Sequence, residues 1–167
     1  MTLPKDLLEQ AQFLVLREPR RPKQASLRRA VSTAYYAGFH LLCSEAASQA
    51  SPESPVELCD RVQRAMAHGT MKAAAKAFES GNLPNYIRSL VSATLPAEIS
   101  SVARTFVQLQ EERHKADYDI ADRFDRARAQ NAVSLTAQLF ADWNTIRDTD
   151  DARVFLAALV FWSIWNK

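Results

Sequence analysis

Glycine and cysteine are scarce in this sequence of 167 residues, which holds three glycines and two cysteines. There is no glycine-rich phosphate loop and no Gly-x-Ser-x-Gly motif, which disfavours the common nucleotide-cradling enzymes and hydrolases. Cys43 and Cys59 do not have the spacing of metal ligands, and no His, Asp, Glu and Cys set has it either. We therefore expect no metal and no cofactor.

A secretory signal is also missing, because the first residues lack the basic-then-apolar order of a signal peptide. We expect a cytoplasmic protein with reduced thiols and no disulfide. The net charge of +2 demands no polyanionic partner.

No hydrophobic run is long enough to span a bilayer. The most apolar stretch, residues 154–165, is well short of the roughly 20 residues that a membrane-spanning helix needs. We expect an apolar helix at about 152–165, buried against the body of the protein or in a subunit interface. An interfacial membrane anchor is the alternative, since Trp162 and Trp165 would suit a lipid headgroup region.

What remains is a helical composition, rich in Ala, Leu, Gln, Glu, Arg and Lys. The length fits one domain, residues 1–167. No alternating strand pattern occurs, and short connections favour an all-α, antiparallel up-and-down bundle with additional short helices. We expect helices over about 5–16, 24 or 26 to 50, 55 to 68 or 69, 70–79, 97 to the 113–119 segment, 124–147 and 152–165, with poorly periodic residues after Pro84.

Polar residues cluster at the end of the fifth expected helix, in the segment from Arg113 to Asp119. Helical neighbours lie three and four positions apart, so Arg113 can reach Asp117, and His114 can reach both Asp117 and Tyr118. A histidine and a tyrosine beside a short aspartate are typical of a fixed polar cluster rather than of an exposed salt-bridge face. We therefore expect the functional site here.

The second expected helix carries a possible complement to this cluster. Arg29, Thr33, Tyr36 and His40 lie on one side of it, at spacings of four, three and four. One interpretation is core filling, with a tyrosine hydroxyl at the edge and a part-buried histidine. The other is that Tyr36 and His40 face the 113–118 cluster and complete a polar pocket.

A basic stretch precedes and opens that helix: Arg17, Arg20, Arg21, Lys23, Arg28 and Arg29 fall within thirteen residues. It could steer a phosphate backbone, or it could be a solvated loop with ordinary surface cations. No aromatic residues that could stack on bases are interleaved with these arginines, which weakens the first interpretation.

Two segments together resemble the HEPN superfamily (higher eukaryotes and prokaryotes nucleotide-binding). They are RRAVSTAYYAGFH at 28–40 and RHKADY at 113–118, similar to the family's R-A-x-S-x-A-Y-Y-A-x-F and R-x-x-A-D-Y helices. The resemblance covers about 20 of the 167 residues. It implies a helical bundle, often dimeric, and in many members a metal-independent ribonuclease; other members are catalytically silent binding or scaffolding modules.

The sequence departs from the active members of that family, in which an Arg-x4–6-His motif performs the chemistry. Tyr118, with four residues between it and Arg113, stands where that motif has a histidine, and His114 lies about 100° round the helix from Arg113. Arg61 and His68 match the spacing literally, but outside the expected helix, and we treat them as coincidental. The resemblance supports the fold more than it supports catalysis.

Our leading hypothesis is a polar site for RNA or a nucleotide, possibly with toxin-type or defence-type cleavage. Arg113 would contact phosphate, His114 would carry the proton, Asp117 would orient either of them, and Tyr118 would hydrogen-bond or stack. The partners would be RNA or a nucleotide, a second copy of the chain, and possibly an antitoxin-type protein. The alternative is a non-catalytic, dimeric interaction or scaffold module; a membrane-associated or small-molecule-binding role is a third possibility.

Overall fold

The structure, a computed structural model, describes residues 2–50 and 56–165. Within these residues every regular element is a helix, which confirms the expected all-α bundle. The helices are α1 (Leu3–Leu16), α2 (Gln24–Ala50), α3 (Val56–Ala65), α4 (His68–Ser80), α5 (Asn85–Arg88), α6 (Ala97–Tyr118), α7 (Arg126–Ile146) and α8 (Asp150–Trp165). The chain forms two compact units: Met1–His40 with Thr105–Phe140, and Leu41–Arg104 with Ala141–Lys167.

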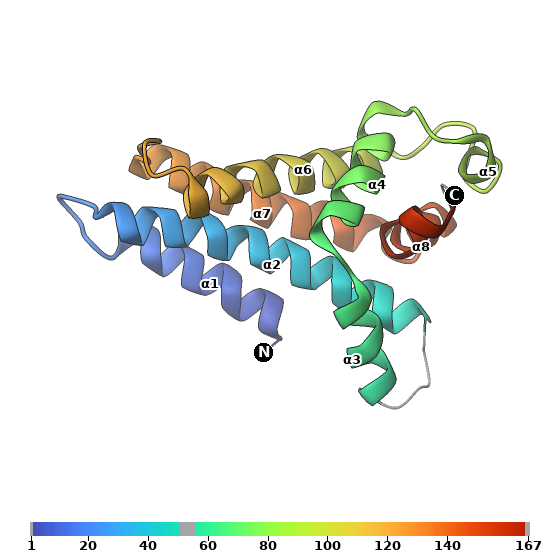
Figure 1. Cartoon of the computed structure of the whole chain (residues 1–167), viewed down its shortest axis with the longest axis horizontal. Helices are drawn as coiled ribbons and strands as arrows, with labels where there is room; N and C mark the ends of the chain where they lie inside the picture. The colour runs from blue at the N-terminus through green and yellow to red at the C-terminus, as the bar shows by residue number, and fades with distance from the viewer. Residues whose placement is uncertain (1, 51–55, 166–167) are drawn as a thin grey trace. The chain divides into compact units, whose positions relative to one another are not determined.

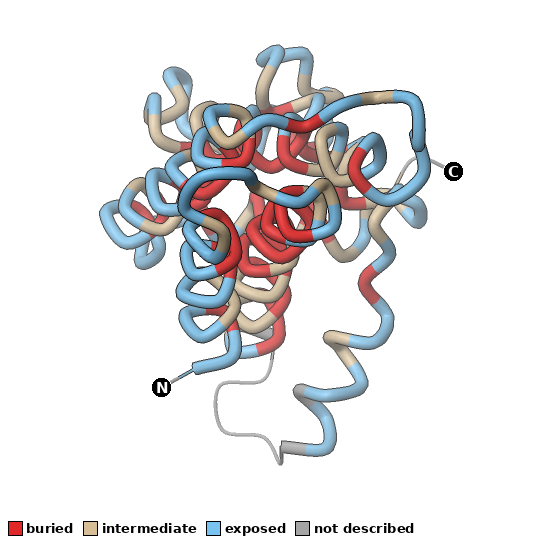
Figure 2. The backbone as a smooth tube through the Cα atoms, turned by 90° about the vertical axis from the view of Figure 1, so that its left-hand side faces the viewer, coloured by how far each residue is buried: buried red, intermediate tan, exposed pale blue. Residues whose placement is uncertain are grey.

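The first unit is an up-and-down bundle of α1 and the adjoining parts of α2, α6 and α7 (Figure 1). Three alanines of α2, Ala30, Ala34 and Ala37, are fully buried, so the stripe that they form carries little side-chain bulk. Larger side chains fill the remaining space: the ring centroids of Tyr35 and Phe106 are 5.8 Å apart. The buried residues of these helices lie on the sides that face one another (Figure 2).

Arg28 fastens the start of α2 to the end of α6. Its Nη1 donates to the carbonyl oxygen of Ala116 at 2.8 Å, and its Nη2 donates to that of Asp119 at 2.8 Å. Nη2 also donates to the carbonyl of Asp122. The last carbonyls of a helix have no partner within the helix, so a cation is favoured there. Arg28 is therefore a helix cap and not one of the solvated cations of the basic stretch.

The second unit contains α3, α4, α5, α8 and the remaining parts of α2, α6 and α7. Its core includes Phe155 of α8, whose ring is 5.0 Å from that of Phe78 in α4 and 6.4 Å from that of Trp143. Cys43 is buried here, and burial raises the pKa of its thiol to about 12, so it stays a thiol near neutral pH.

The apolar C-terminal helix begins at Asp150 and serves in part as core. Ala152, Phe155, Leu156, Ala158 and Leu159 are buried, as expected for burial against the body. Its last turns are open: the exposed large side chains there are Phe161 and Ile164. No helix in the described residues is long and apolar enough to cross a membrane.

The boundaries between Ala50 and Pro96 differ from expectation. The expected start at Pro55 lies outside the described residues, and α3 ends at Ala65 because Ala67 is extended (φ −109°, ψ 132°). His68 therefore opens α4, and the literal Arg61-to-His68 spacing spans two helices. Gly81, at φ 71°, ends α4 in the left-handed conformation that favours glycine. The expected irregular segment contains the short helix α5.

Replacing Phe155 by alanine tests the core of the second unit. We expect Phe155→Ala to lower the free energy of unfolding by about 3–5 kcal/mol, because the fully buried ring leaves a cavity. Phe161→Ala on the same helix is the control, with an expected loss under about 1 kcal/mol at this exposed position. Urea unfolding followed by circular dichroism measures both, and equal losses would contradict this assignment of the core.

Candidate functional site

Arg113 of α6 is the centre of the polar cluster, and its partners come from α6 and α2. Its Nε lies 2.7 Å from Asp117 Oδ2, and its Nη2 donates to the Tyr36 hydroxyl at 2.8 Å. The side chain is only 17% exposed. The expected Arg113–Asp117 pair is therefore present, and Tyr36 does face the cluster.

Aromatic rings enclose the same guanidinium. Its Cζ lies 5.5 Å from the ring centroid of Tyr36, 5.5 Å from that of Tyr118 and 6.0 Å from that of Tyr35. A cation within about 6 Å of an aromatic face is attracted by the ring's negative potential. The rings of Tyr36, from α2, and Tyr118, from α6, therefore both hold Arg113.

Asp117 is held in turn by Ser32, whose hydroxyl donates to Asp117 Oδ1. Burial by itself lowers the pKa of Arg113, but the hydrogen bond with Tyr36 and the charge of Asp117 outweigh it and raise that pKa. Arg113 is therefore a cation at neutral pH, and its ion pair with Asp117 fixes the orientation of the guanidinium.

Three residues of α2 contact α6: Arg28, Ser32 and Tyr36, four positions apart. Tyr36 belongs to the polar stripe expected on α2, whereas Arg29 of that stripe is exposed and takes part in none of these contacts. A long helix has several polar stripes, and the packing of α6 selects among them.

Both histidines of this unit lie beside the cluster. His114 is exposed, and its ring is 5.1 Å from that of Tyr118. His40 is half-buried, 6.3 Å from the ring of Tyr36, and burial lowers its pKa, which favours the neutral imidazole. The expected contact between His114 and Tyr118 is therefore present, and His40 joins the site through Tyr36.

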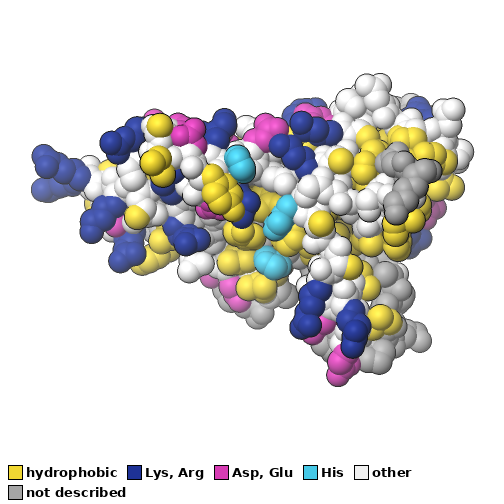
Figure 3. All heavy atoms as spheres, viewed as in Figure 1, with side chains coloured by type: hydrophobic (Ala, Val, Ile, Leu, Met, Phe, Trp, Pro, Cys, Tyr) yellow, Lys and Arg dark blue, Asp and Glu magenta, His cyan; other side chains and the backbone are white. Residues whose placement is uncertain are grey.

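Together these residues form a continuous row, which we call the aromatic row: His40, Tyr36, Arg113, Tyr118 and His114. Each member lies 5.1–6.3 Å from the next, ring to ring or guanidinium to ring. The row is open to solvent at Tyr118, which is 64% exposed, and at the exposed His114. Figure 3 shows histidine side chains at the surface beside hydrophobic ones.

A cluster of cations, which we call the basic end, lies where the α1–α2 and α6–α7 loops meet. Arg126 Nη2 donates to the carbonyls of Glu18 and Pro19, and the Gln24 side-chain amide bonds both backbone groups of Phe124. These contacts bring together the exposed or half-exposed side chains of Arg17, Arg20, Arg21, Lys23, Arg123 and Arg126. Figure 3 shows Lys and Arg side chains gathered at this end of the unit.

Three acids near the basic end are held in ion pairs: Glu18 with Arg17, and Glu112 and Asp122 with Arg128. Asp122 pairs with Arg128 Nη1 at 2.9 Å, and Arg128 Nη2 donates to Glu112 Oε1 at 3.1 Å. The guanidinium of Arg128 also lies 3.9 Å from the Phe124 ring centroid. Nothing in the sequence pattern indicated this network, because its members are six and sixteen residues apart.

Arg128 also sets the protonation of both acids. Burial alone would raise the pKa of Glu112, but hydrogen bonds from Arg128 and Lys115 lower it below its usual range. The hydrogen bond from Arg128 lowers the pKa of Asp122. Both carboxylates therefore stay ionised at neutral pH.

Comparison with known proteins gives no relative of this chain, because it matches no family model, no curated protein and no solved structure. Within residues 2–50 and 56–165, no group of three or more His, Cys, Asp or Glu side chains could hold a metal ion.

Removing the Asp117 carboxylate tests whether the cluster stabilises the fold. We expect Asp117→Ala to lower the free energy of unfolding by about 1–3 kcal/mol, because the largely buried Arg113 and Ser32 both lose a partner. Tyr118→Phe is the control, and its change should stay within about 0.5 kcal/mol because this phenol is exposed. Thermal and urea unfolding measure both; an unchanged stability in Asp117→Ala would contradict the structural role.

The Arg128 network predicts a loss of stability in acid. Folding depresses the pKa values of Glu112 and Asp122, so their contribution is present above the unfolded values of 4.5 and 3.8 and disappears as the pH falls through the lower folded values. The difference in unfolding free energy between the wild type and Arg128→Gln should be constant from about pH 7 to pH 5 and shrink below about pH 4. Urea unfolding across this range measures it, and a difference that persists undiminished at lower pH would refute the assignment.

Proposed function

We propose that the aromatic row binds single-stranded RNA, with the basic end attracting its phosphates. The observation that carries the proposal is the row itself: two exposed rings, Tyr118 and His114, backed by a guanidinium that is held in place. Bases stack on aromatic side chains whatever their sequence, and a fixed arginine beside the ring adds cation–π attraction.

The charge distribution supports the same ligand. The cations of the basic end stand at the end of the unit where α6 reaches Tyr118, and Arg28 joins the two regions by capping α6. Six Lys and Arg side chains gather at this end, whereas the net charge of the whole chain is only +2. Such a cluster attracts a polyanion and makes binding depend on salt.

The geometry favours binding over cleavage. Two of the three guanidinium nitrogens of Arg113 are engaged, Nε with Asp117 and Nη2 with Tyr36, and the side chain is largely buried. A ribonuclease of the HEPN type would need this charge on the scissile phosphate. We therefore propose a HEPN-like binding module in which Arg113 positions the rings and does not act on the phosphate.

A matched pair of aromatic substitutions tests the proposal. We expect Tyr118→Ala to weaken binding of a fluorescent single-stranded RNA by about 5- to 150-fold, the value of one lost base stack. Phe13→Ala on α1 is the control: both side chains are 64% exposed, and Phe13 lies outside the row and the basic end. Fluorescence anisotropy measures the dissociation constants, and circular dichroism checks that both variants fold.

Equal affinities of Tyr118→Ala and the wild type would sink the RNA proposal and favour the interaction-module alternative. The salt dependence of binding supplies a second readout, since the combined Arg20→Gln and Arg21→Gln change should make it less steep.

Incubation of the same RNA with the protein in EDTA tests whether the protein cleaves RNA without a metal ion. Degradation by the wild type that is lost in His114→Ala would overturn the assignment of Arg113 and His114 to binding alone.

A further inference from the structure

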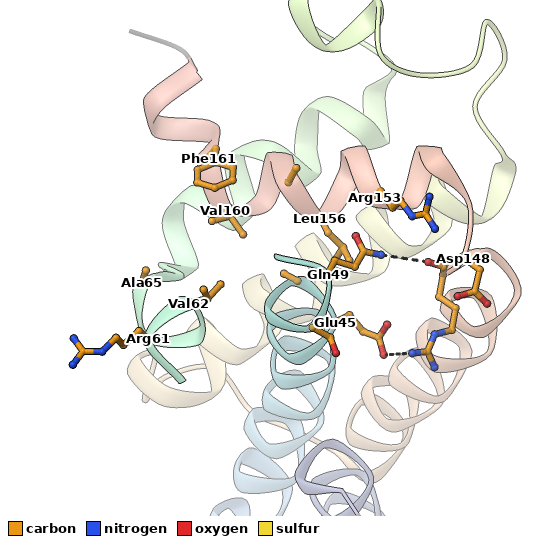
Figure 4. A pocket seen from close by; sticks show the side chains of 14 residues that line it. Glu45, Gln49, Arg61, Val62, Ala65, Asp148, Arg153, Leu156, Val160 and Phe161 are labelled. Carbon is orange, nitrogen blue, oxygen red and sulfur yellow. Dashed lines mark hydrogen bonds and ion pairs between the residues drawn. The ribbon is translucent and has the colours of Figure 1, made fainter. Parts of the chain in front are cut away.

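A cavity of about 830 Å³ lies in the second unit, between the last turns of α2, α3, the α7–α8 turn and α8 (Figure 4). Cavities of roughly 300–1,000 Å³ are typical of small-molecule sites. None of its lining residues belongs to the aromatic row or the basic end, so this cavity is not the proposed RNA site.

One end of the cavity is apolar. Val62 and Ala65 of α3 face Val160 and Phe161 of α8 across it, and Leu156 continues this surface toward the middle. Val62 and Val160 are half-buried and Phe161 is 41% exposed, so these side chains leave apolar surface that a ligand would cover. Burial of such surface favours binding of an alkyl chain.

The other end is polar, and its two guanidinium groups are already ion-paired. Glu45 pairs with Arg147 at 3.0 Å, and the Gln49 side-chain amide donates to the Arg147 carbonyl at 3.5 Å. Asp148 and Arg153 complete this end, where Arg153 pairs with Asp150, outside the lining, at 2.9 Å; Figure 4 shows Arg61 pointing away from the cavity. This end therefore offers hydrogen-bond donors and acceptors, while the charges of Arg147 and Arg153 are already compensated.

From this division we infer that the cavity binds a single-chain amphiphile with an uncharged, hydrogen-bonding head group. The head would lie at the α7–α8 turn and the alkyl chain against Val62, Val160 and Phe161. An anionic head would meet Glu45 and Asp148, and a cationic head would meet the two arginines. From Arg153 to Phe161 the helix rises about 12 Å, a length that suits a medium-length chain.

Three probes with the same alkyl length separate the head groups: 1-decanoylglycerol, decanoate and decyltrimethylammonium, each below its micelle-forming concentration. Isothermal titration calorimetry on the full chain should give one site for 1-decanoylglycerol, with an affinity at least about tenfold higher than for either charged probe. Ala157→Trp, which fills the cavity from α8, should weaken this binding by about tenfold or more.

Ala141→Trp on α7 is the matched control and should bind as the wild type does, because Ala141 is exposed and does not line the cavity. If Ala157→Trp does not fold, Val160→Asp provides a second test by placing a charge at the apolar end.

Tighter binding of either charged probe would overturn the uncharged head, and unchanged affinity in the filled variant would overturn the site. A change from dimer to monomer in Ala157→Trp, seen by sedimentation, would assign the cavity to a second copy and also overturn the inference. The RNA assay with Tyr118→Ala is independent of all these outcomes.

Discussion

The arrangement of α2 against α6 depends on the charge of Arg113. A guanidinium that is largely removed from water is stable only where anions, dipoles and hydrogen-bond acceptors replace the lost hydration. Here they are Asp117 on the same helix and Tyr36 on the neighbouring one. Ser32 then holds Asp117, so the two residues four apart on α6 meet two residues four apart on α2.

This pairing sets the register of the two helices. In an antiparallel pair, one turn forward on one helix is one turn back on the other. Tyr36 therefore meets Arg113, Ser32 meets Asp117, and Arg28 meets the carbonyls beyond it. A slip of one residue would rotate each residue of α2 by about 100° and separate Tyr36 from Arg113 and Ser32 from Asp117. The polar contacts thus specify one alignment, whereas the alanine-rich face of α2 would tolerate several.

The sequence predicts the parts of this arrangement that are local. Prolines, Gly81 and apolar periodicity predict most of the helices, and the four-residue spacing predicts the ion pair of Arg113 with Asp117. The sequence did not predict the contacts between the helices. Arg28 has the sequence context of a surface cation, and its capping role exists only because α6 ends beside it. Ser32 is the serine of the R-A-x-S-x-A-Y-Y-A-x-F resemblance, but nothing in that pattern indicated Asp117 as its partner.

The proposed RNA site combines one side chain that is held rigidly with two that are exposed. The contacts of Arg113 leave it little freedom. His114, the next residue, and Tyr118, five residues further along the helix than Arg113, remain at the surface. A ligand that stacks on Tyr118 would meet a ring already positioned by the guanidinium behind it, so little conformational entropy would be lost on binding. The price is that Arg113 is no longer available to a phosphate. A binding surface and a catalytic arginine are therefore competing uses of the same side chain, and the partners of Arg113 in this fold favour the first.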